Sequence, residues 1–469
     1  MAEKRIGALT RRHLLAGLPL LAQSEPVARI GGRRELFVDD TLIDSLRGAE
    51  LRLGTPVERE VVLKLDRPHE GPFSAYFTVL HDNGKYRLYY RGVPEAGKDG
   101  RPSEATCYAE SADGRQFTKP ANNILFQGQA PFSHNFCPFI DRNPRGGARY
   151  KALSGIATSG LKAWISDDGL AWRALREEPV MPATKLPMFD SQNLAFWSES
   201  EGCYVAYVRQ FRDRVRSIVR AISDDFVRWS PFVPLDLGGA PADHLYTNQL
   251  HPYFRAPHIY VGIAARFNPG RQVLTPDEAR ATGVHPDYFK DTSDSVLLST
   301  RGGATISRYF RESFLRPGLG LHHWVSRDNY PCLNIVETGE GEMSFYVNRH
   351  YGQPTAHLTR YSLRTDGLAS LHAGWRGGEL LTRPLVFSGR ALELNFASSA
   401  YGGVRVQVLN EDETAIEGLG LADCREMIGD RVAKAVEWRN GNLAALAGKP
   451  VRLLFALKDA DVYSFRFTG

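Results

Sequence analysis

Acidic, amide and histidine side chains recur at one kind of position in this chain, just before short stretches rich in aromatic and β-branched residues. Such stretches have the composition of strands. Five polar groups precede them, at residues 69–70, 134–135, 190–193, 243–248 and 327–329. If the stretches are inner strands of one closed array, these side chains converge on its axis. Carboxylates that face one axis can supply the acid and the second carboxylate that cleavage of a glycosidic bond requires.

Three acids are the catalytic candidates: Glu70, Asp190 and Asp328. We expect Asp190 to act as general acid and Glu70 as nucleophile or base, and the two roles can be exchanged. Asp243 is an alternative to Asp328 as the third acid. Asp40, which follows an apparent entry strand, is a further candidate. A single residue of this type often only caps the entry to a strand, so the prediction depends on five groups in register.

Arginines form a second pattern, because several follow directly or closely after Tyr- or Val-rich stretches. Guanidinium groups at one rim suit the carboxylate or sulfate of an anionic sugar, although they could equally neutralise the acids of the centre. Trp324 could stack on a sugar ring or pack between blades. The predicted substrate-binding residues are Arg91, His134, Asn135, Gln192, Arg209, Asp243, Asn248, Arg266, Trp324, Arg327 and Arg349.

A repeat indicates what positions these residues. Residues 109–117, 164–172 and 221–229 carry nearly the same pattern of Ser, Asp and a following aromatic residue, with Gly after the Asp in the first two copies. The aspartates Asp113, Asp168 and Asp225 are separated by 55 and 57 residues. Two weaker copies of the same pattern follow at residues 298–303 and 363–368. A repeat of this length is typical of one four-stranded blade. The sequence therefore predicts an all-β protein with a five-bladed β-propeller over residues 67–384.

Three other segments flank the predicted propeller. Residues 385–469 alternate apolar and polar side chains, which favours a β-sandwich. Residues 25–66 are expected to form an entry strand and a linker. Residues 1–24 carry Arg11-Arg12 ahead of a short apolar stretch, the pattern of a twin-arginine (Tat-type) export signal, which predicts a periplasmic or secreted protein.

Composition excludes several classes of function. The net charge of +5 is not concentrated in any basic patch, so we expect no nucleic-acid partner, and no stretch is long enough to span a membrane. The five cysteines stand singly and are expected to be buried apolar residues, without disulfides. No phosphate-binding loop or nucleophile elbow is present. We expect no metal and no cofactor.

The architecture resembles that of glycoside hydrolase families 32, 43 and 68, and residues 35–40, 143–151, 189–193 and 314–318 resemble exported bacterial proteins labelled family-32-like. The resemblance implies an Asp at the first inner strand and further acids on later blades. Here residues 74–76 offer no carboxylate, the second blade offers Asn135, and only the third is matched, by Asp190. The acids of these families are thus not all present at the corresponding positions.

The prediction for function is an exported glycoside hydrolase that acts on a poly- or oligosaccharide, with its catalytic site rebuilt around Glu70, Asp190 and another acid. Two alternatives stay open. One is a propeller that binds carbohydrate without cleaving it. The other is a polysaccharide lyase, which would use His134, Tyr246 and the arginines on an anionic glycan.

Overall fold

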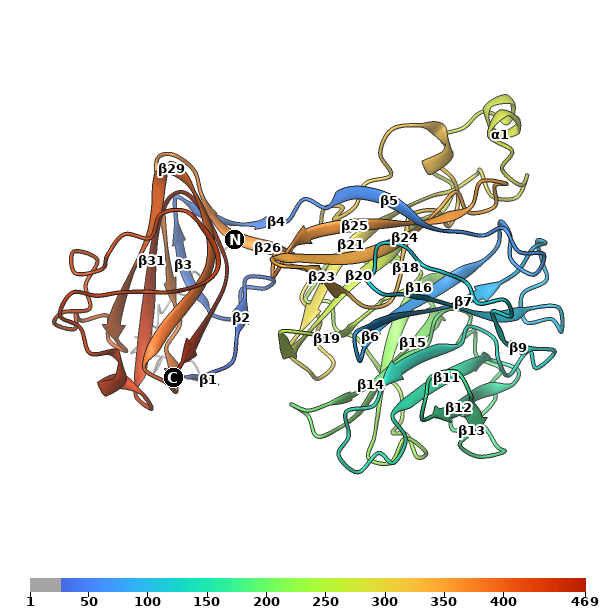
Figure 1. Cartoon of the computed structure of the whole chain (residues 1–469), viewed down its shortest axis with the longest axis horizontal. Coiled ribbons are helices and arrows are strands. Elements are labelled where there is room, and N and C mark those ends of the chain that lie inside the picture. The colour runs from blue at the N-terminus through green and yellow to red at the C-terminus, as the bar shows by residue number, and fades with distance from the viewer. Residues whose placement is uncertain (1–26) are drawn as a thin grey trace, which may run out of the picture.

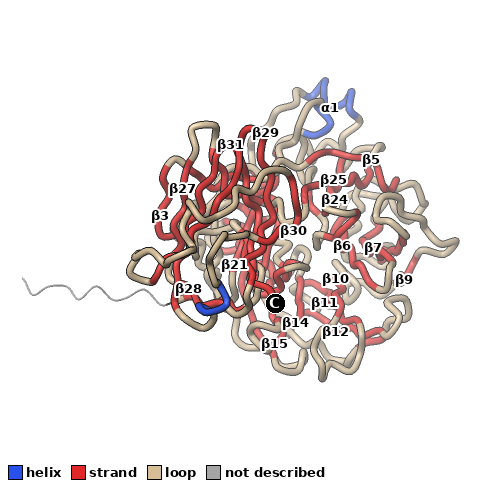
Figure 2. Tube along the Cα trace, turned by 60° about the vertical axis from the view of Figure 1, so that its left-hand side comes forward, coloured by secondary structure: helices blue, strands red, loops and turns tan. Residues whose placement is uncertain are grey.

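The computed structural model describes residues 27–469 and is almost entirely β-structure. Figure 1 shows two bodies, a propeller and a sandwich, and Figure 2 shows strands throughout both, with α1 (Pro276–Thr282) on an outer loop of the propeller. No described helix has the length and apolar character needed to cross a membrane. The predicted export signal lies outside the described residues and stays a prediction.

Five antiparallel sheets form the propeller and confirm the predicted architecture. Blades 1 to 3 follow chain order from the inner to the outer strand, whereas the inner position of blades 4 and 5 is shared by two short strands. The strands of blades 1 to 3 are β6 (Ala75–Asp82), β7 (Lys85–Gly92), β8 (Ala105–Ser111), β9 (Ile124–Gln127); β10 (Cys137–Ile140), β11 (Tyr150–Ile156), β12 (Gly160–Ser166), β13 (Arg173–Ala174); and β14 (Leu194–Ser198), β15 (Cys203–Arg212), β16 (Val215–Ser223), β17 (Val233–Pro234).

Blades 4 and 5 complete the ring. Their strands are β18 (His244–Leu245), β19 (His251–Tyr253), β20 (Ala256–Asn268), β21 (Thr292–Thr300); and β22 (Tyr330–Pro331), β23 (Val336–Gly339), β24 (Glu342–Arg349), β25 (His357–Arg364), with β5 (Val57–Lys64) as the outermost strand of blade 5. Because β5 pairs with β25, a strand from near the N-terminus closes the last blade. The propeller thus includes residues that the sequence analysis assigned to a linker.

The repeated sequence forms a hydrogen-bonded turn at the end of the third strand in each of blades 1 to 3. In blade 2, Asp168 Oδ1 accepts hydrogen bonds from the N–H groups of Leu170 and Ala171, both at 2.8 Å, and from Ser166. Backbone N–H groups hold the pKa of Asp168 below its usual value. The aromatic that follows, Trp172, packs on Phe136 with ring centroids 4.8 Å apart. The repeat therefore fixes packing and lies away from the inner strands.

The second body is a ten-stranded β-sandwich, and it too takes residues from both ends of the described chain. The long strands β29 and β31 pair over most of their length. The strands are β1 (Ala28–Gly31), β2 (Glu35–Leu36), β3 (Ile43–Arg47), β4 (Ala49–Leu53), β26 (Ala369–Ala373), β27 (Gly378–Thr382), β28 (Leu385–Phe387), β29 (Ala391–Asn410), β30 (Asp430–Ala435) and β31 (Pro450–Thr468). The sandwich extends beyond residues 385–469, because β1 to β4 and β26 to β27 pair within it.

The two bodies share one apolar core and a buried carboxylate. Leu36 and Phe465 of the sandwich belong to the same cluster of buried side chains as Val261 of blade 4. Asp366, in the turn after β25, accepts hydrogen bonds from Tyr253 of blade 4 (2.8 Å) and from sandwich residues, and the sandwich therefore packs directly on the propeller. All five cysteines are buried and free, as predicted.

Candidate functional site

The inner strands of the propeller begin at residues held in an unusual backbone conformation. Tyr76, Asn135, Gln249 and Asn329, at the starts of four inner strands, have φ between 52 and 62°. Residues other than glycine adopt this left-handed region at a cost, and such positions cluster at functional sites. The tight turns direct polar side chains toward the axis at one end of the propeller. We call this end the mouth.

Buried amides form the floor of the mouth. Gln192 Nε2 donates to Thr78 Oγ1 of blade 1 at 2.8 Å, and Gln249 Nε2 donates both to Gln192 Oε1 at 2.9 Å and to the Pro331 carbonyl of blade 5 at 2.7 Å. Asn135 Nδ2 donates to the carbonyl of Ser191. The predicted residues Asn135 and Gln192 therefore do meet near the axis, where they tie the blades together.

Arginines and tyrosines alternate above this floor. The Arg91 guanidinium lies 4.7 Å from the ring centroid of Tyr76, and Arg209 lies 4.8 Å from that of Tyr246. Arg327 lies between two rings, at 5.5 Å from Tyr246 and 5.0 Å from the Tyr288 ring. Arg216 lies 5.0 Å from the Tyr246 centroid and completes the group. The structure therefore gathers the predicted residues Arg209 and Arg327 around Tyr246, and places Arg91 on Tyr76, which packs in the same cluster as Tyr246.

Several guanidinium nitrogens of this group have no hydrogen-bond partner among the described residues. They are Arg91 Nε, Arg209 Nε, Arg209 Nη1 and Arg216 Nε. Arg91 and Arg209 are themselves buried. A buried donor without an acceptor is costly, so these nitrogens favour an acceptor supplied by a ligand.

Two carboxylates face the same mouth. Asp190, preceding blade 3, is 75% exposed and accepts a hydrogen bond from Arg209 Nη2 at 2.8 Å. Asp99, on the loop between β7 and β8, lies 3.8 Å from Arg91 Nη1. Partial burial opposes the charge of Asp99, but Arg91 and His134 hold the pKa of its carboxyl below its usual value. Asp99 is therefore ionised at neutral pH.

A buried histidine–glutamate pair lies beside these groups. His134 Nδ1 is 2.7 Å from Glu104 Oε2, and the other oxygen of Glu104 has no partner among the described residues. Burial opposes ionisation of Glu104, yet the hydrogen bond from His134 leaves the pKa of the carboxyl lowered. A carboxylate on Nδ1 fixes the tautomer of the imidazole and leaves Nε2 as the acceptor.

Tyr76 remains a neutral phenol in this surrounding. Burial, with Tyr246 nearby, raises the pKa of Tyr76 well above its usual value, although Arg91 opposes the shift. Tyr76, Asp99, Glu104, Arg216 and Tyr288 were missed by the sequence analysis. Asp99 and Glu104 lie in a loop with no strand pattern, and only their position after a Tyr-rich strand could have indicated them.

Glu70 does not reach the mouth. It is fully buried at the outer edge of blade 1, where it accepts hydrogen bonds from Tyr90 (2.6 Å), Lys119 (2.5 Å) and Asn123 (3.0 Å). His69 and Cys107 lie near enough for the three to hold a metal ion, but both oxygens of Glu70 are already engaged. Glu70 therefore belongs to a compact structural network, and it is not placed for the catalytic role at the mouth that the sequence suggested.

Other predicted residues form structural pairs around the rim. Arg266 makes a two-pronged contact with Asp294, at 2.8 and 2.6 Å, and Asp243 binds Arg308 at 2.9 Å. Arg349 is buried behind blade 5 against Tyr361 and Asn329.

The remaining predicted residues lie in three different places. Trp324 donates to the Gly318 carbonyl, and Asn248 Oδ1 accepts from Leu250 N–H at the start of β19. Asp328 is buried among histidines next to Arg327. Asp40 lines a cavity between the sandwich and blade 4, away from the mouth.

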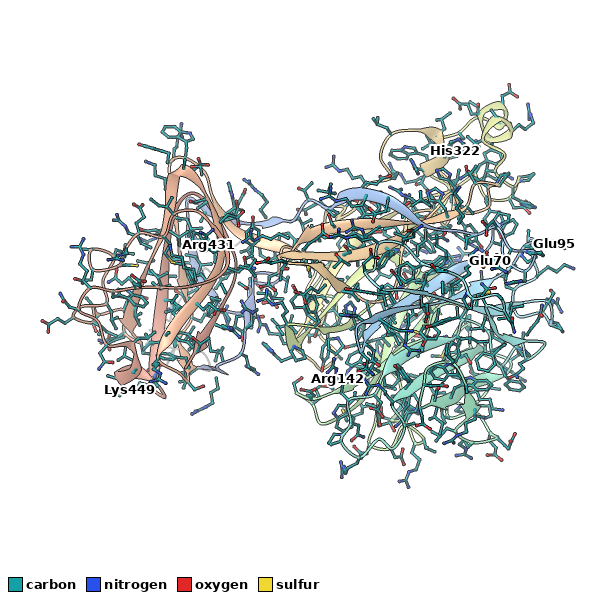
Figure 3. The ribbon with its side chains drawn as sticks, in the orientation of Figure 1. Glu70, Glu95, Arg142, His322, Arg431 and Lys449 are labelled. Carbon is teal, nitrogen blue, oxygen red and sulfur yellow. The ribbon has the colours of Figure 1, made fainter. Side chains whose placement is uncertain are left out.

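A separate cavity of about 520 Å³ opens at the other end of the axis. Inner-strand residues of all five blades line it, among them Val79, Phe139, Leu194, Leu250 and Leu333. Figure 3 places Arg142, which also lines it, on the side nearer the sandwich, whereas Glu70 and Glu95 lie at the opposite side. Its lining is mixed, with apolar inner-strand residues beside Arg142, Glu199 and His251. The mouth is the candidate site because arginines with unpartnered donors and two exposed carboxylates meet there.

No protein-family model and no curated protein sequence matches this chain. Solved structures align with about two thirds of it. BT0996, in its complex with RGII, is 11% identical over 66% of the present protein and 92% of its own length, with a TM-score of 0.46. The beta-1,2-mannobiose phosphorylase from Listeria innocua is 11% identical over 68% and 98%, with a TM-score of 0.44. An N-acetylgalactosamine deacetylase from F. plautii is 11% identical over 68% and 96%, with a TM-score of 0.42. These likenesses are too distant to assign a function.

Proposed function

We propose that this protein is an enzyme that cleaves glycosidic bonds in an anionic glycan at the mouth of the propeller. One observation supports this most directly: four arginines, Arg91, Arg209, Arg216 and Arg327, surround only two exposed carboxylates there, and several of their buried donors lack partners. A carboxylate or sulfate on a sugar would satisfy those donors with paired, charge-assisted hydrogen bonds.

The proposed chemistry uses Asp190 and Asp99 as the two carboxylates, with Asp99 in the role that the sequence suggested for Glu70. The lowered pKa of Asp99 suits a base or nucleophile, which must be ionised. Asp190 is paired with Arg209 in the free protein. A substrate anion that binds Arg209 would compete with this pair and release Asp190 for the role of general acid.

The tyrosines of the mouth would hold the sugar. The Tyr76 phenol is neutral and can donate or accept a hydrogen bond, and the half-buried ring of Tyr288 offers an apolar face to a sugar ring. Each of these rings already has an arginine beside it. The anionic group and the sugar ring of one residue could therefore be recognised together.

The test compares full-length protein on a panel of glycans that carry uronates, sulfates or neither, with release of reducing ends as the readout. We expect activity only on anionic glycans, and about a 100-fold or greater loss in both Asp190→Asn and Asp99→Asn, because general acid–base catalysis contributes at least that much. Asp225→Asn, in an exposed turn of blade 3, is the matched control. Full activity in either site variant, or equal cleavage of neutral glycans, would contradict the proposal.

A lyase is the second candidate, because Tyr76 and the His134–Glu104 pair lie beside Arg91, which could neutralise a uronate during β-elimination. The same assay separates the two. A lyase gives a product with the absorbance of an unsaturated uronate, and it loses activity in Tyr76→Phe or His134→Gln. Binding of an anionic glycan without any product would instead favour a propeller that only binds carbohydrate.

A further inference from the structure

Four histidines gather on two loops of blade 5, next to the mouth but outside it. His322 and His323 form the 3₁₀ turn η1 (Leu321–His323), whereas His350 and His357 flank the loop between β24 and β25. The ring centroid of His350 lies 4.8 Å from that of His322, 5.0 Å from His323 and 4.7 Å from His357. Figure 3 shows His322 on an outer loop near α1. Four of the 13 histidines of the chain thus share one site.

A buried carboxylate faces this cluster without a full set of partners. The side chain of Asp328 is completely buried, and its Oδ2 lies 3.6 Å from His323 Nδ1, too far for a hydrogen bond. Neither atom has another partner among the described residues. A buried carboxylate oxygen in this state is costly unless something cationic completes its surroundings.

The tautomers of two histidines leave a nitrogen free to bind a metal. His357 Nδ1 donates to the Thr355 carbonyl at 2.7 Å, and His322 Nδ1 is 2.6 Å from Gln353 Oε1. Gln353 Nε2 donates to the His322 carbonyl, which fixes the orientation of the amide and makes Oε1 the acceptor. Each imidazole therefore keeps its lone pair on Nε2. Histidines that bind metals characteristically engage their other nitrogen in this way.

We propose that Asp328, His323 and His350, with His322 or His357 as a fourth ligand, bind one divalent transition-metal ion of the Zn²⁺ class. Imidazole and carboxylate ligands suit zinc, whereas calcium and magnesium prefer oxygen ligands alone. The His322 and His350 rings are stacked, with 25° between their planes, so the rings must turn to direct their lone pairs at one ion. Both are only half-buried, which gives them room to turn.

The position suggests what the ion would do. Asp328 directly follows Arg327, which lies between the rings of Tyr246 and Tyr288 in the mouth. An ion on Asp328 would join η1 to the loop after β24 and so stiffen this side of the mouth. The site itself does not depend on the proposed glycan chemistry, because metal binding is measured without any substrate.

The experiment titrates full-length, chelator-treated protein with Zn²⁺ against a chromophoric competitor, and records the visible spectrum after addition of Co²⁺. We expect one ion per chain and Co²⁺ bands of a four-coordinate nitrogen and oxygen site. The variants His350→Asn, His323→Asn and Asp328→Asn should each weaken Zn²⁺ binding by more than about 100-fold, since even changes behind the ligands cost about 10- to 100-fold.

Two control variants decide where the ion binds. His372→Asn alters a histidine–aspartate pair in the sandwich (3.1 Å from Asp461) and should bind Zn²⁺ like the parent protein. His69→Asn alters a different group of close potential ligands, His69, Glu70 and Cys107, and it too should bind normally. Absence of binding in the parent protein, unchanged binding in all three site variants, or loss of binding in His69→Asn would overturn the proposal. Circular dichroism verifies that each variant is folded, and the three site variants provide independent tests.

Discussion

At the scale of single residues, we expect Arg209 to bind the anionic group of the substrate. It is buried, and one nitrogen binds Asp190 while Nε and Nη1 lack partners among the described residues. Arg209→Lys keeps the positive charge but removes the fork that matches a carboxylate or sulfate. We expect KM for an anionic glycan to rise about 10- to 100-fold, because hydrogen bonds to charged groups contribute about 1.5–3 kcal/mol. Thermal stability should change little.

Steady-state kinetics measure this effect, and Arg228→Lys, on an exposed turn, is the control. An unchanged KM in Arg209→Lys would show that Arg209 serves only to hold Asp190. A loss confined to kcat would point instead to a role for the Arg209–Asp190 pair in the chemical step.

His251 makes the stability of the protein depend on pH. It is fully enclosed, its Nδ1 lies 2.8 Å from the Gln249 carbonyl, and Ile335 N–H donates to its Nε2 at 3.2 Å. Both ring nitrogens are therefore engaged with the neutral ring, and burial lowers the pKa of His251 to about 4. The unfolded chain takes up this proton near pH 6.5, but the folded protein does so only near pH 4. Stability must therefore fall as the pH falls through this window.

We expect His251 to account for a loss of about 3 kcal/mol in the free energy of unfolding between pH 6.5 and pH 4. Urea unfolding at several pH values measures it. In His251→Gln the slope of that free energy against pH should be smaller by up to about 1.4 kcal/mol per pH unit. His285→Gln, on a surface loop, should keep the parent slope, and an identical slope in both variants would contradict the assignment to His251.

The sequence indicated which types of residue line the candidate site better than it indicated which residues contact one another. Asn135 and Gln192, which precede inner strands, meet near the axis, and Asp190, Arg91, Arg209 and Arg327 lie at the same end of the propeller. Glu70 has the same position relative to its strand, yet Lys119 and Asn123, 49 and 53 residues away, enclose it. Contacts over such separations leave no local pattern. For the same reason the histidine cluster, spread over residues 322–357, could not be predicted from spacing.

At the scale of the elements, one buried arginine strengthens the pairing of the closing strand β5 with β25. Arg360 of β25 donates twice to Glu60, at 2.9 and 3.1 Å, and also to Glu342 and Ser344, both at 2.9 Å. Arg360→Ala removes all of these hydrogen bonds across the blade. We expect the free energy of unfolding to fall by about 2–3 kcal/mol, since charge-assisted hydrogen bonds are the strong ones.

Urea denaturation tests this, with Arg59→Ala as the matched control in the same strand pair. Arg59 is 44% exposed, donates one hydrogen bond to Ser362 Oγ at 2.8 Å and lies 4.0 Å from Glu342, so its removal should cost about 1 kcal/mol or less. Faster proteolysis around residues 54–66 in Arg360→Ala would locate the effect at β5. Equal losses in the two variants would mean that Arg360 does not hold this strand.

The repeat allowed the elements of the propeller to be predicted, because each copy ends a third strand with the same turn and aromatic residue. Of the closing strand and the first four strands of the sandwich, the sequence indicated only one entry strand. Their partners, β25, β26, β27, β28 and β31, lie about 300 or more residues later in the chain. Short strands with distant partners carry little local signal, so the rest of residues 25–66 resembled a linker.

At the scale of the whole molecule, Asp366 connects the two bodies. Its buried carboxylate accepts from Tyr253 and Arg255 of blade 4, at 2.8 and 2.9 Å, and from Asn395 and Ser464 of the sandwich, at 3.0 and 2.6 Å. The N-terminal Arg34 lies 3.6 Å from the same group. Because this network lies against the shared apolar core, the propeller and the sandwich should unfold together.

Differential scanning calorimetry should therefore give one transition for the parent protein, with equal calorimetric and van't Hoff enthalpies. Asp366→Ala leaves Arg255 without its carboxylate and Arg34 with Glu393 alone, and removing one partner of a buried pair costs about 3–5 kcal/mol. We expect this variant to melt at a lower temperature, with the transition split in two as the sandwich separates from the propeller. Asp412→Ala, at an exposed sandwich turn where the carboxylate binds only Thr414, should behave like the parent protein. Two separate transitions in the parent protein would mean that the interface around Asp366 is too weak to couple the two bodies.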